Sequence, residues 1–350
     1  MSRVFVLGNA TVDLTLAMPA WPRPGETMLA RSLSRGPGGK GLNQAYAAAR
    51  AGGAATLAAP IGEDENGAYL RAFAAEAGLF AARWRRCGAA TDVSTIWVAN
   101  DGENMIVSSA DCARSVGPGE VEGLLDGFSR GDLLVVQGNL RADTTLAACR
   151  HASRLGGRTL VNTAPIDWPM DELLGLADVV ACNRPEAEAI AGASARDAAT
   201  RIAGSARGAV FLTLGAEGAL VAEAGVVAPV RAPQVAALDT SGAGDVAVGF
   251  LAAALAAGQP LRAAAEVAVR AASLSVTRPG TLSSCPAGEE VPPSAAGAPC
   301  CGPASPADEG PSSPGAGRAR TGEATAGGRR TDRTPVVTRL ENEPNRRTVE

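Results

Sequence analysis

The chain has 350 residues, of which 46% are hydrophobic, and a net charge of −4, so it can bury a large core but lacks the basic face that nucleic acid requires. No apolar run is long enough to span a membrane, and the N-terminus has no signal-peptide pattern. The seven cysteines indicate neither a disulfide framework nor a zinc site, so we expect a cytoplasmic protein with reduced thiols.

Short apolar runs alternate with alanine-rich helical patterns along most of the chain. The predicted strands are Val4–Leu7, Leu133–Gln137, Thr159–Asn162, Val179–Ala181, Val210–Leu214 and Ala219–Ala222. The predicted helices are Leu42–Ala51, Gly67–Glu76, Thr144–Arg154, Arg184–Ala191, Ala198–Ala206 and Val246–Ala257. This alternation predicts an α/β fold in which helices cover both faces of a mostly parallel sheet.

Three regions break this alternation. Residues 11–35 and 91–109 contain alternating patterns without helices between them, which predicts antiparallel strands outside the main sheet, as in a small lid. From Cys285 to Glu350 the chain is rich in Pro, Gly, Ser and Arg and has no aromatic residue. Such a segment buries too little apolar surface to offset its ordering entropy, so we expect a disordered tail at 285–350 after one domain at 1–284.

Residues Asp239–Asp245 form the most informative run. They follow a β-like segment, Val235–Leu238, and lead into a helical pattern, so Gly242, Ala243 and Gly244 occupy a helix N-terminus. Free backbone N–H groups and the helix dipole favour an anion such as phosphate there. Asp245 suits a general base that takes a proton from an attacking hydroxyl, although acids are also common in the first turn of ordinary helices.

A second glycine-rich turn spans residues Gly36–Gln44. It contains the dinucleotide pattern G-x-G-x-x-G, but it does not follow the first strand directly, and its spacing also fails for a Walker loop. Lys40, the only lysine of the chain, and Asn43 suit close contact with a polyhydroxyl ligand. The alternative is a tight loop with a solvated lysine.

Three further turns follow predicted strands, at the edge where open α/β sheets bind ligands. Thr11 and Asp13 follow the first strand and are candidates to face a substrate. Asn183 and Glu186 either contribute to a Mg²⁺ and phosphate site or form an ordinary capping box. Residues 213–218 either pass beneath a nucleotide or form a plain β-turn.

These motifs in this order resemble the ribokinase-like (PfkB) family of sugar and nucleoside kinases. The N-terminal signature matches Gly38–Gln44 and the C-terminal signature matches Asp239–Asp245, while the resemblance as a whole runs from Val4 to Ser284. The form Gly-Gly-Lys-Gly-x-Asn-Gln is most similar to the ribokinase branch. The resemblance implies a three-layer α/β/α, Rossmann-like fold with a small β-sheet lid.

The resemblance also implies roles for single residues. Asp245 corresponds to the general base, and Gly242, Ala243 and Gly244 correspond to the anion hole. The positions that contact sugar are Thr11, Asp13, Gly38, Gly39, Lys40, Asn43 and Asn139. The positions that line the nucleotide site or organise Mg²⁺ and phosphates are Asn183, Glu186, Thr213, Gly215 and Gly218.

A monovalent cation, K⁺, is implied beside the anion hole. Its ligand positions are Asp239, Ser241, Ser275, Arg278, Gly280 and Ser284. The expected ligands are therefore a small sugar, ATP, Mg²⁺ and K⁺, and the lid is expected to join two copies of the chain as a homodimer.

The sequence leaves the acceptor open. Ribokinases usually have Asn where Thr11 stands and a carboxylate where the chain has Asn139. A pentose such as ribose is the first expectation. A nucleoside, or a sugar phosphate bound by Arg35 or Arg141, is an alternative within the family. An inactive sugar-binding protein and, last, a nicotinamide-dependent oxidoreductase are the alternatives from other classes.

Overall fold

The structure, a computed structural model, describes residues 2–79, 81–100 and 104–291. Most of the predicted tail therefore lies outside the described residues, as do Cys300 and Cys301. Within the described part, no helix combines the length and the apolar character needed to cross a bilayer.

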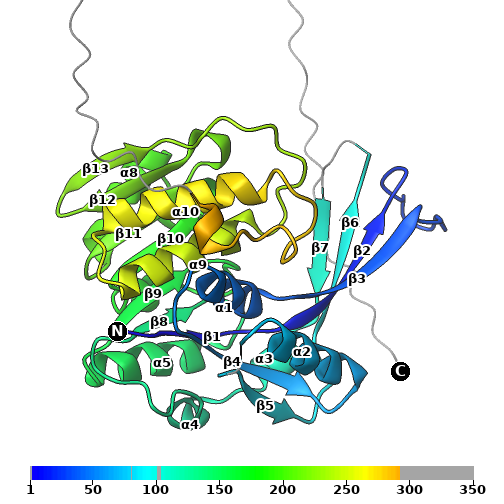
Figure 1. Cartoon of the computed structure of the whole chain (residues 1–350), viewed down its shortest axis with the longest axis horizontal. Coiled ribbons are helices and arrows are strands. Elements are labelled where there is room, and N and C mark those ends of the chain that lie inside the picture. Colours follow the sequence, from blue (N-terminus) through cyan, green and yellow to red (C-terminus); the bar gives the residue numbers. More distant parts are fainter. Residues whose placement is uncertain (1, 80, 101–103, 292–350) are drawn as a thin grey trace, which may run out of the picture. The chain divides into compact units, whose positions relative to one another are not determined.

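A nine-stranded sheet forms the centre of the domain, in the order β13-β12-β11-β10-β9-β8-β1-β4-β5 (Figure 1). The neighbours from β11 across the sheet to β5 all pair in parallel, while β12 and β13 add an antiparallel edge next to β11. The strands are β1 Val4–Leu7, β4 Ala55–Gly62, β5 Arg83–Cys87, β8 Leu133–Val136, β9 Arg158–Asn162, β10 Val179–Asn183, β11 Ala209–Thr213, β12 Ala219–Glu223 and β13 Val226–Val230. The expected mostly parallel sheet is confirmed.

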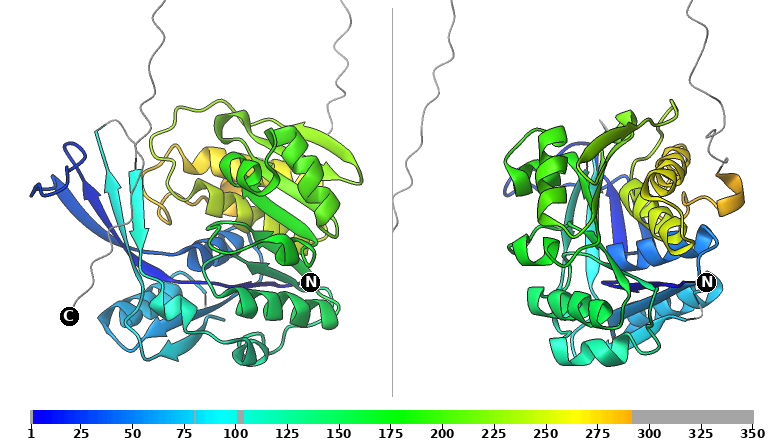
Figure 2. Two further views of the ribbon diagram at one scale, coloured as in Figure 1. Left: turned by 180° about the vertical axis from the view of Figure 1, so that it is seen from behind. Right: turned by 90° about the vertical axis from the view of Figure 1, so that its left-hand side faces the viewer.

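Helices cover both faces of this sheet, as the right-hand view of Figure 2 shows. On one face lie α1 Lys40–Arg50, α2 Glu65–Glu76, α9 Ala243–Ala256 and α10 Leu261–Ser275. On the other lie α3 Asp111–Arg114, α4 Val121–Leu124, α5 Ala142–Arg154, α6 Asp171–Leu174, α7 Arg184–Ala191 and α8 Ala195–Ser205. Side chains alternate across a strand, so Val4 and Val6 of β1 join the first core while Phe5 and Leu7 join the second.

A separate four-stranded sheet forms the lid, in the order β3-β2-β6-β7. Its strands are β2 Thr11–Ala17, β3 Ser32–Gly38, β6 Val93–Val98 and β7 Asn104–Ser108. These strands fall within the expected 11–35 and 91–109 regions, except that β3 runs on to Gly38. The expected antiparallel pairing is found for β2 with β3 and for β6 with β7, but β2 and β6 pair in parallel.

Other departures from the expected elements have identifiable causes. The segment Val235–Leu238 is exposed and forms no strand of the described sheets. Strand β4 contains Pro60, and β5 contains three arginines among its five residues, so neither shows a recognisable strand pattern. The long helix α10 is not among the expected elements, although Gly258 and Pro260 separate it from α9.

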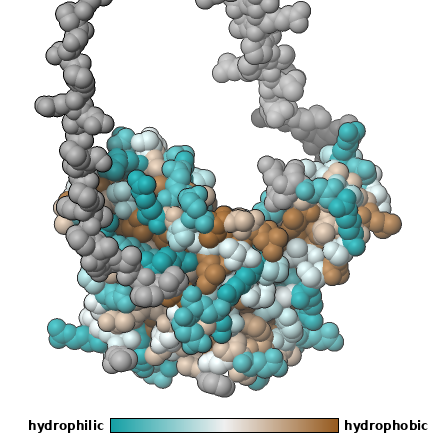
Figure 3. Space-filling view, turned by 45° about the horizontal axis from the view of Figure 1, so that its top comes forward, coloured by the Kyte–Doolittle hydropathy of each residue, from teal (hydrophilic) through white to brown (hydrophobic). Residues whose placement is uncertain are grey.

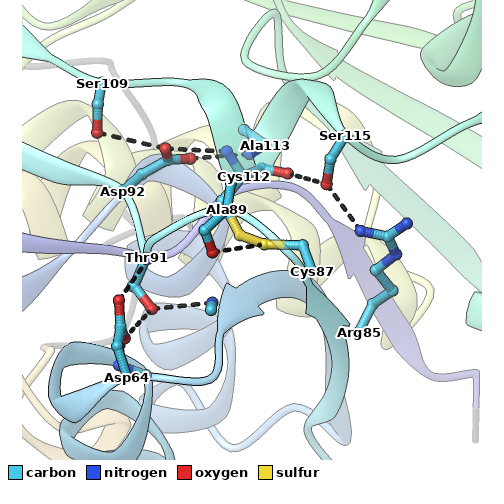
Figure 4. The surroundings of a disulfide bond; sticks show 12 residues. Asp64, Arg85, Cys87, Ala89, Thr91, Asp92, Ser109, Cys112, Ala113 and Ser115 are labelled. Carbon is cyan, nitrogen blue, oxygen red and sulfur yellow. Dashed lines mark hydrogen bonds between the residues drawn. A yellow bond between two sulfur atoms is a disulfide. The ribbon is translucent and has the colours of Figure 1, made fainter.

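Cys87 and Cys112 form a disulfide, so the expectation of reduced thiols is wrong for this pair (Figure 4). The bond joins the end of β5 to α3, which follows the lid strand β7. The N–H groups of Cys112 and Ala113 donate to Asp92 at 3.1 and 2.8 Å, so the same turn is held twice. Among the described residues, Cys149, Cys182 and Cys285 are free and buried.

The end of the described chain packs onto the domain beyond the expected boundary at Ser284. Cys285 is buried in the core that contains α1 and α9, and Val291 packs against the same core. Glu290 pairs with Arg278 at 2.6 Å. The segment between Cys285 and Val291 is therefore ordered structure, and only the remainder of the predicted tail is left without a description.

Candidate active site

The N-terminus of α9 lies between two cavities of about 500 and about 610 Å³. Thr240 and Gly244 line both cavities, whereas Asp245 lines only the larger one. The larger cavity lies where the lid meets the main domain, and the space-filling view shows the molecule hollowed between these parts (Figure 3). The two cavities therefore meet at a helix N-terminus, where the first N–H groups have no partner within the helix itself.

Gly242 is the residue that caps this helix. Its φ of 74° lies in the left-handed region, and an added Cβ would approach the Cγ2 of Thr281 to 2.5 Å. Only glycine meets both conditions without strain. The closeness of Gly242 to Thr281 also shows that the loop at 275–284 lies directly beside the helix N-terminus. The resemblance implies such a loop for a cation site next to an anion hole.

Asp245 is buried in the first turn of α9, with 7% of its surface exposed. Asn43 Nδ2 donates to its Oδ2 at 2.9 Å, and Gln44 Nε2 donates to its Oδ1 at 2.9 Å. The ammonium of Lys40 lies 3.6 Å from Oδ1. Lys40, Asn43 and Gln44 share one face of α1 because residues three and four apart on a helix are neighbours. The two signatures thus meet at one carboxylate.

Asp13 is a second carboxylate of the larger cavity. Thr11 Oγ1 donates to its Oδ1 at 2.7 Å. Burial raises the pKa of Asp13 above its usual value, partly offset by hydrogen bonds from Thr11 and Ser94, and the negative charge of Asp245 raises it further. An ionisable acceptor therefore faces the same cavity as the candidate base.

The expected sugar-contacting residues divide into two groups. Asp13, Gly39, Lys40, Asn43 and Asn139 line the larger cavity. Thr11 and Gly38 do not line it, yet both position Asp13: Thr11 by its hydrogen bond, and Gly38 because any Cβ there would meet the Asp13 carboxylate at 2.0 Å. The buried amide oxygens of Asn43 and Asn139 have no hydrogen-bond partner within the described structure, so both are free to accept from a ligand.

The smaller cavity contains the residues expected at a nucleotide site. Asn183, Thr213, Gly215 and Gly218 line it together with Ala243 and Gly244. Exposed apolar side chains of the extended segment after β13, including Val235, lie at its edge. Glu186 does not line this cavity.

Asn183 and Glu186 form a capping box at the start of α7, the ordinary alternative considered from sequence. Asn183 Oδ1 accepts from Glu186 N at 2.8 Å, and Glu186 Oε2 accepts from Asn183 N at 3.2 Å. Thr163 Oγ1 also donates to Oε2, at 2.8 Å. The structure gives Oε1 of Glu186 no partner among the described residues, so one carboxylate oxygen is left for water.

Three expected cation positions are tied together by the side chain of Asp239. Its Oδ1 accepts from Ser241 N at 2.9 Å and its Oδ2 from Gly280 N at 2.8 Å. Burial opposes ionisation of Asp239, but these two backbone N–H groups hold its pKa below the usual value. Ser275 and Ser284, at the two ends of the loop that contains Gly280, are buried. The side chain of Arg278 in this loop donates to Glu290. No cluster of three or more His, Cys, Asp or Glu side chains that would hold a metal ion occurs in the described part.

Sequence reasoning missed several residues of the larger cavity. Arg114 and Asp167 pair with each other at its rim, and Ile96 and Ile106 approach from the lid. None of them belongs to a recognisable motif, because their place depends on how the lid and α3 fold over the sheet. Arg35 and Arg141, the candidates for binding a sugar phosphate, do not line this cavity. Arg35 bonds Asn66 and Arg141 bonds Asp143.

Known carbohydrate kinases are similar to this chain over most of its length. Residues 1–288 match the model of the pfkB family carbohydrate kinases. The chain is 30% identical to a ribokinase of Haemophilus influenzae, over 82% of this chain and 96% of that protein. It is 32% identical to a ribokinase of Mus musculus, over 83% and 93%. It also superposes on a ribokinase of Cryptococcus neoformans in complex with ADP, with a TM-score of 0.69 and 27% identity over 83% of this chain and 99% of that one.

Proposed function

Because the chain belongs to the pfkB family of carbohydrate kinases, which phosphorylate an alcohol group, we propose that it transfers the γ-phosphoryl group of ATP to a hydroxyl of a small sugar, with a pentose such as ribose as the acceptor. The observation that carries the proposal is the meeting of two cavities at the N-terminus of α9. One cavity suits a nucleotide, the other a polyol, and Gly244 lines both.

The larger cavity supports a polyhydroxyl acceptor. It combines the carboxylate of Asp13 with the two unpartnered amide oxygens of Asn43 and Asn139, and a sugar has hydroxyl donors for all three. Site groups of this kind discriminate strongly, because a ligand without the matching hydroxyl leaves them unpaired. Asn139, standing where ribokinases usually have a carboxylate, still accepts a hydrogen bond but adds no charge.

In the proposed reaction, Asp245 takes the proton of the attacking hydroxyl as the oxygen forms its bond to the γ-phosphorus and ADP leaves. The N–H groups at Gly242, Ala243 and Gly244 then face the charge on the transferring phosphoryl group. Phosphoryl transfer requires mainly positioning and charge stabilisation from the protein. Lys40, 3.6 Å from Asp245, adds a positive charge on the acceptor side.

The residues present also fit the two implied metal ions. Glu186 keeps one carboxylate oxygen for a water-mediated contact with Mg²⁺, which prefers oxygen ligands and retains waters. Asp239, kept ionised by its two backbone donors, fits K⁺ beside the anion hole. When bound, both ions would offset the negative charge of the phosphates.

Two further proposals concern the whole protein. We propose a homodimer joined through the lid, because Met105 and Val107, which lie on the face of β7 opposite to the cavity-lining Ile106, are 56% and 68% exposed. Val107→Asp should then lower the mass in light scattering from dimer to monomer, whereas Val226→Asp, at an equally exposed valine of β13, should not. A monomeric wild type would contradict the proposal.

We also propose a cytoplasmic location, where ATP is available.

A panel of acceptors tests the reaction itself. We expect ADP release with pentoses, faster with K⁺ than without it, and little release with sugar phosphates, because the one arginine found at the larger cavity is paired with Asp167. Nucleosides are the second candidate, since Ile96 and Ile106 offer apolar contact for a base. Measurable sugar binding without ADP release under any condition would instead favour a non-catalytic sugar-binding protein.

A further inference from the structure

Behind the candidate base lies a chain of buried side-chain amides. Gln137 Nε2, at the end of β8, donates to Gln44 Oε1 at 2.7 Å. Gln44 Nε2 in turn donates to Asp245 Oδ1 at 2.9 Å and to Asn162 Oδ1 at 3.1 Å. Gln44, Gln137 and Asn162 are 0%, 1% and 8% exposed, so water does not substitute for these bonds.

The orientations of Gln44 and Asn162 are each determined by a group that can only accept, whereas Oε1 of Gln137 has no partner among the described residues. Asn162 Nδ2 donates to the backbone oxygen of Ala181 at 3.1 Å, which leaves its Oδ1 facing Gln44. The carboxylate of Asp245 also requires a donor from Gln44. Both constraints place the NH₂ group of Gln44 toward Asp245, and its Oε1 then faces Gln137.

These amides belong to neither cavity. Lys40, Asn43 and Asp245 line the larger cavity, but Gln44, Gln137 and Asn162 line neither the larger nor the smaller one. They therefore do not contact a sugar or a nucleotide bound in these cavities. Any effect that they have on the reaction passes through Asp245.

We propose that Gln44 and Gln137 are positioning residues for the reaction, a role that rests on the proposed function of Asp245 as general base. Gln44 holds Oδ1 from behind, so that the carboxylate is fixed between α1 and the cavity. Gln137 keeps Gln44 in the only amide orientation that donates to Asp245. A flipped Gln44 would direct its oxygen at the carboxylate and repel it.

Gln137→Met tests this proposal, because methionine has a similar length and no donor. We expect kcat to fall by about 10- to 100-fold, as for a misplaced catalytic group. KM for sugar and for ATP should change less than about two-fold, because Gln137 lines neither cavity. A kcat within about two-fold of wild type, or a loss that appears in KM alone, would overturn the proposal.

Gln137→Glu distinguishes positioning from simple packing. The introduced carboxyl donates an O–H to Gln44 Oε1 when protonated, but repels that oxygen when ionised and so favours the flipped amide. Burial moves its titration toward neutral pH. The kcat of Gln137→Glu relative to wild type should therefore fall as pH rises, while the same ratio for Gln137→Met stays flat. Equal and flat ratios for the two variants would refute an orienting role.

Two controls separate this proposal from the proposed function and from loss of folding. Thr159→Val removes a buried hydroxyl, which donates to the oxygen of Leu176 at 2.8 Å, and should lower Tm without changing kcat. Asp245→Asn tests the base directly. Near-normal turnover of Asp245→Asn would refute the base, whereas an inactive Asp245→Asn beside a fully active Gln137→Met would refute only the positioning role.

Discussion

Asp239 and Asp245 begin and end the same short signature, yet the protein holds their carboxylates in different ways. Asp245 is buried and receives side-chain amides from α1, a helix at the other end of the domain's sequence. Asp239 is half-buried and receives backbone N–H groups from Ser241 and Gly280. Asp245 also lines a cavity large enough for a sugar, and Asp239 does not.

Under the proposed function, the difference separates a reacting carboxylate from a supporting one. Asp245 is held by side-chain donors and faces the cavity in which the acceptor would bind. The backbone donors of Asp239 instead fix two loops against each other and favour a permanent negative charge. One signature thus contains a chemical group and a structural group, and substitutions at the two should affect different measurements.

Asp245→Asn should have the largest effect. The variant keeps an oxygen and the shape of the side chain but loses the base, so we expect kcat to fall by about 10²- to 10⁴-fold. Sugar binding measured by calorimetry should persist, because the other groups of the larger cavity are unchanged. If Asp239→Asn reduced kcat as much as Asp245→Asn does, the distinction between the two carboxylates would fail.

Asp13→Asn sharpens the comparison with a third carboxylate. We expect KM for the sugar to rise about 10- to 100-fold, as for a lost hydrogen bond to a charged group. The raised pKa of Asp13 means that the folded state disfavours its charge, so the carboxylate lowers stability at neutral pH. Tm at pH 7 should therefore stay equal or rise in the variant. A lower Tm would contradict this assignment.

The same raised pKa predicts a pH dependence for the wild type. As pH falls, Asp13 becomes protonated at a higher pH than an ordinary aspartate and loses its capacity to accept two hydrogen bonds. KM for the sugar should rise on the acid side, beginning above the usual carboxyl range. In Asp13→Asn the acid-side rise in KM should disappear.

Asp239→Asn should have a smaller effect, on stability first. The lowered pKa of Asp239 means that its carboxylate contributes stability above the usual carboxyl range, and that this contribution is lost only as pH falls through the lowered value. Losing one of two backbone bonds at a half-exposed site should cost about 1 kcal/mol. Tm should drop at pH 7 and activation by K⁺ should weaken. An unchanged Tm together with unchanged activation would contradict the supporting role.

The sequence predicts the sheet, and indicates Asp245 as a candidate, for physical reasons. Strands such as β8 are continuous apolar runs because both faces are buried, and such runs are readable without tertiary information. The two signatures are local turns into helices, where glycine and small polar residues are required by backbone geometry. Asp245 is therefore identifiable from its own neighbours.

The features that the sequence did not predict depend on contacts between residues that are far apart in the sequence. Gln137 acquires its role only because β8 ends beside α1, which places it 2.7 Å from Gln44. Arg114 reaches the larger cavity only because α3 packs below the lid. The sequence does not indicate that Cys87 pairs with Cys112, because the two residues come together only through the positions of β5 and of α3, which follows β7. The expected end of the domain at Ser284 depends on composition, and composition does not show that one residue beyond it, Cys285, is buried in the core.

Glu290→Gln should give the smallest effect and tests how the end of the described chain supports Asp239. Glu290 pairs with Arg278, whose loop supplies Gly280 to Asp239, and this pairing lowers the pKa of Glu290 to about 2. Its stabilising contribution is therefore present above the usual carboxyl range and lost as pH falls toward about 2.

Because the Glu290 carboxylate is solvated, the change in Tm for Glu290→Gln should be slight, and it should vanish near 1 M salt, where the Debye length is about 3 Å. Glu289→Gln removes the same charge from an exposed neighbour and is the matched control. If Glu290→Gln weakens activation by K⁺ more than Glu289→Gln does, the pair with Arg278 holds the loop that meets Asp239. Equal effects of the two variants would show that the support of Asp239 ends at Gly280, and that Glu290 adds only surface charge.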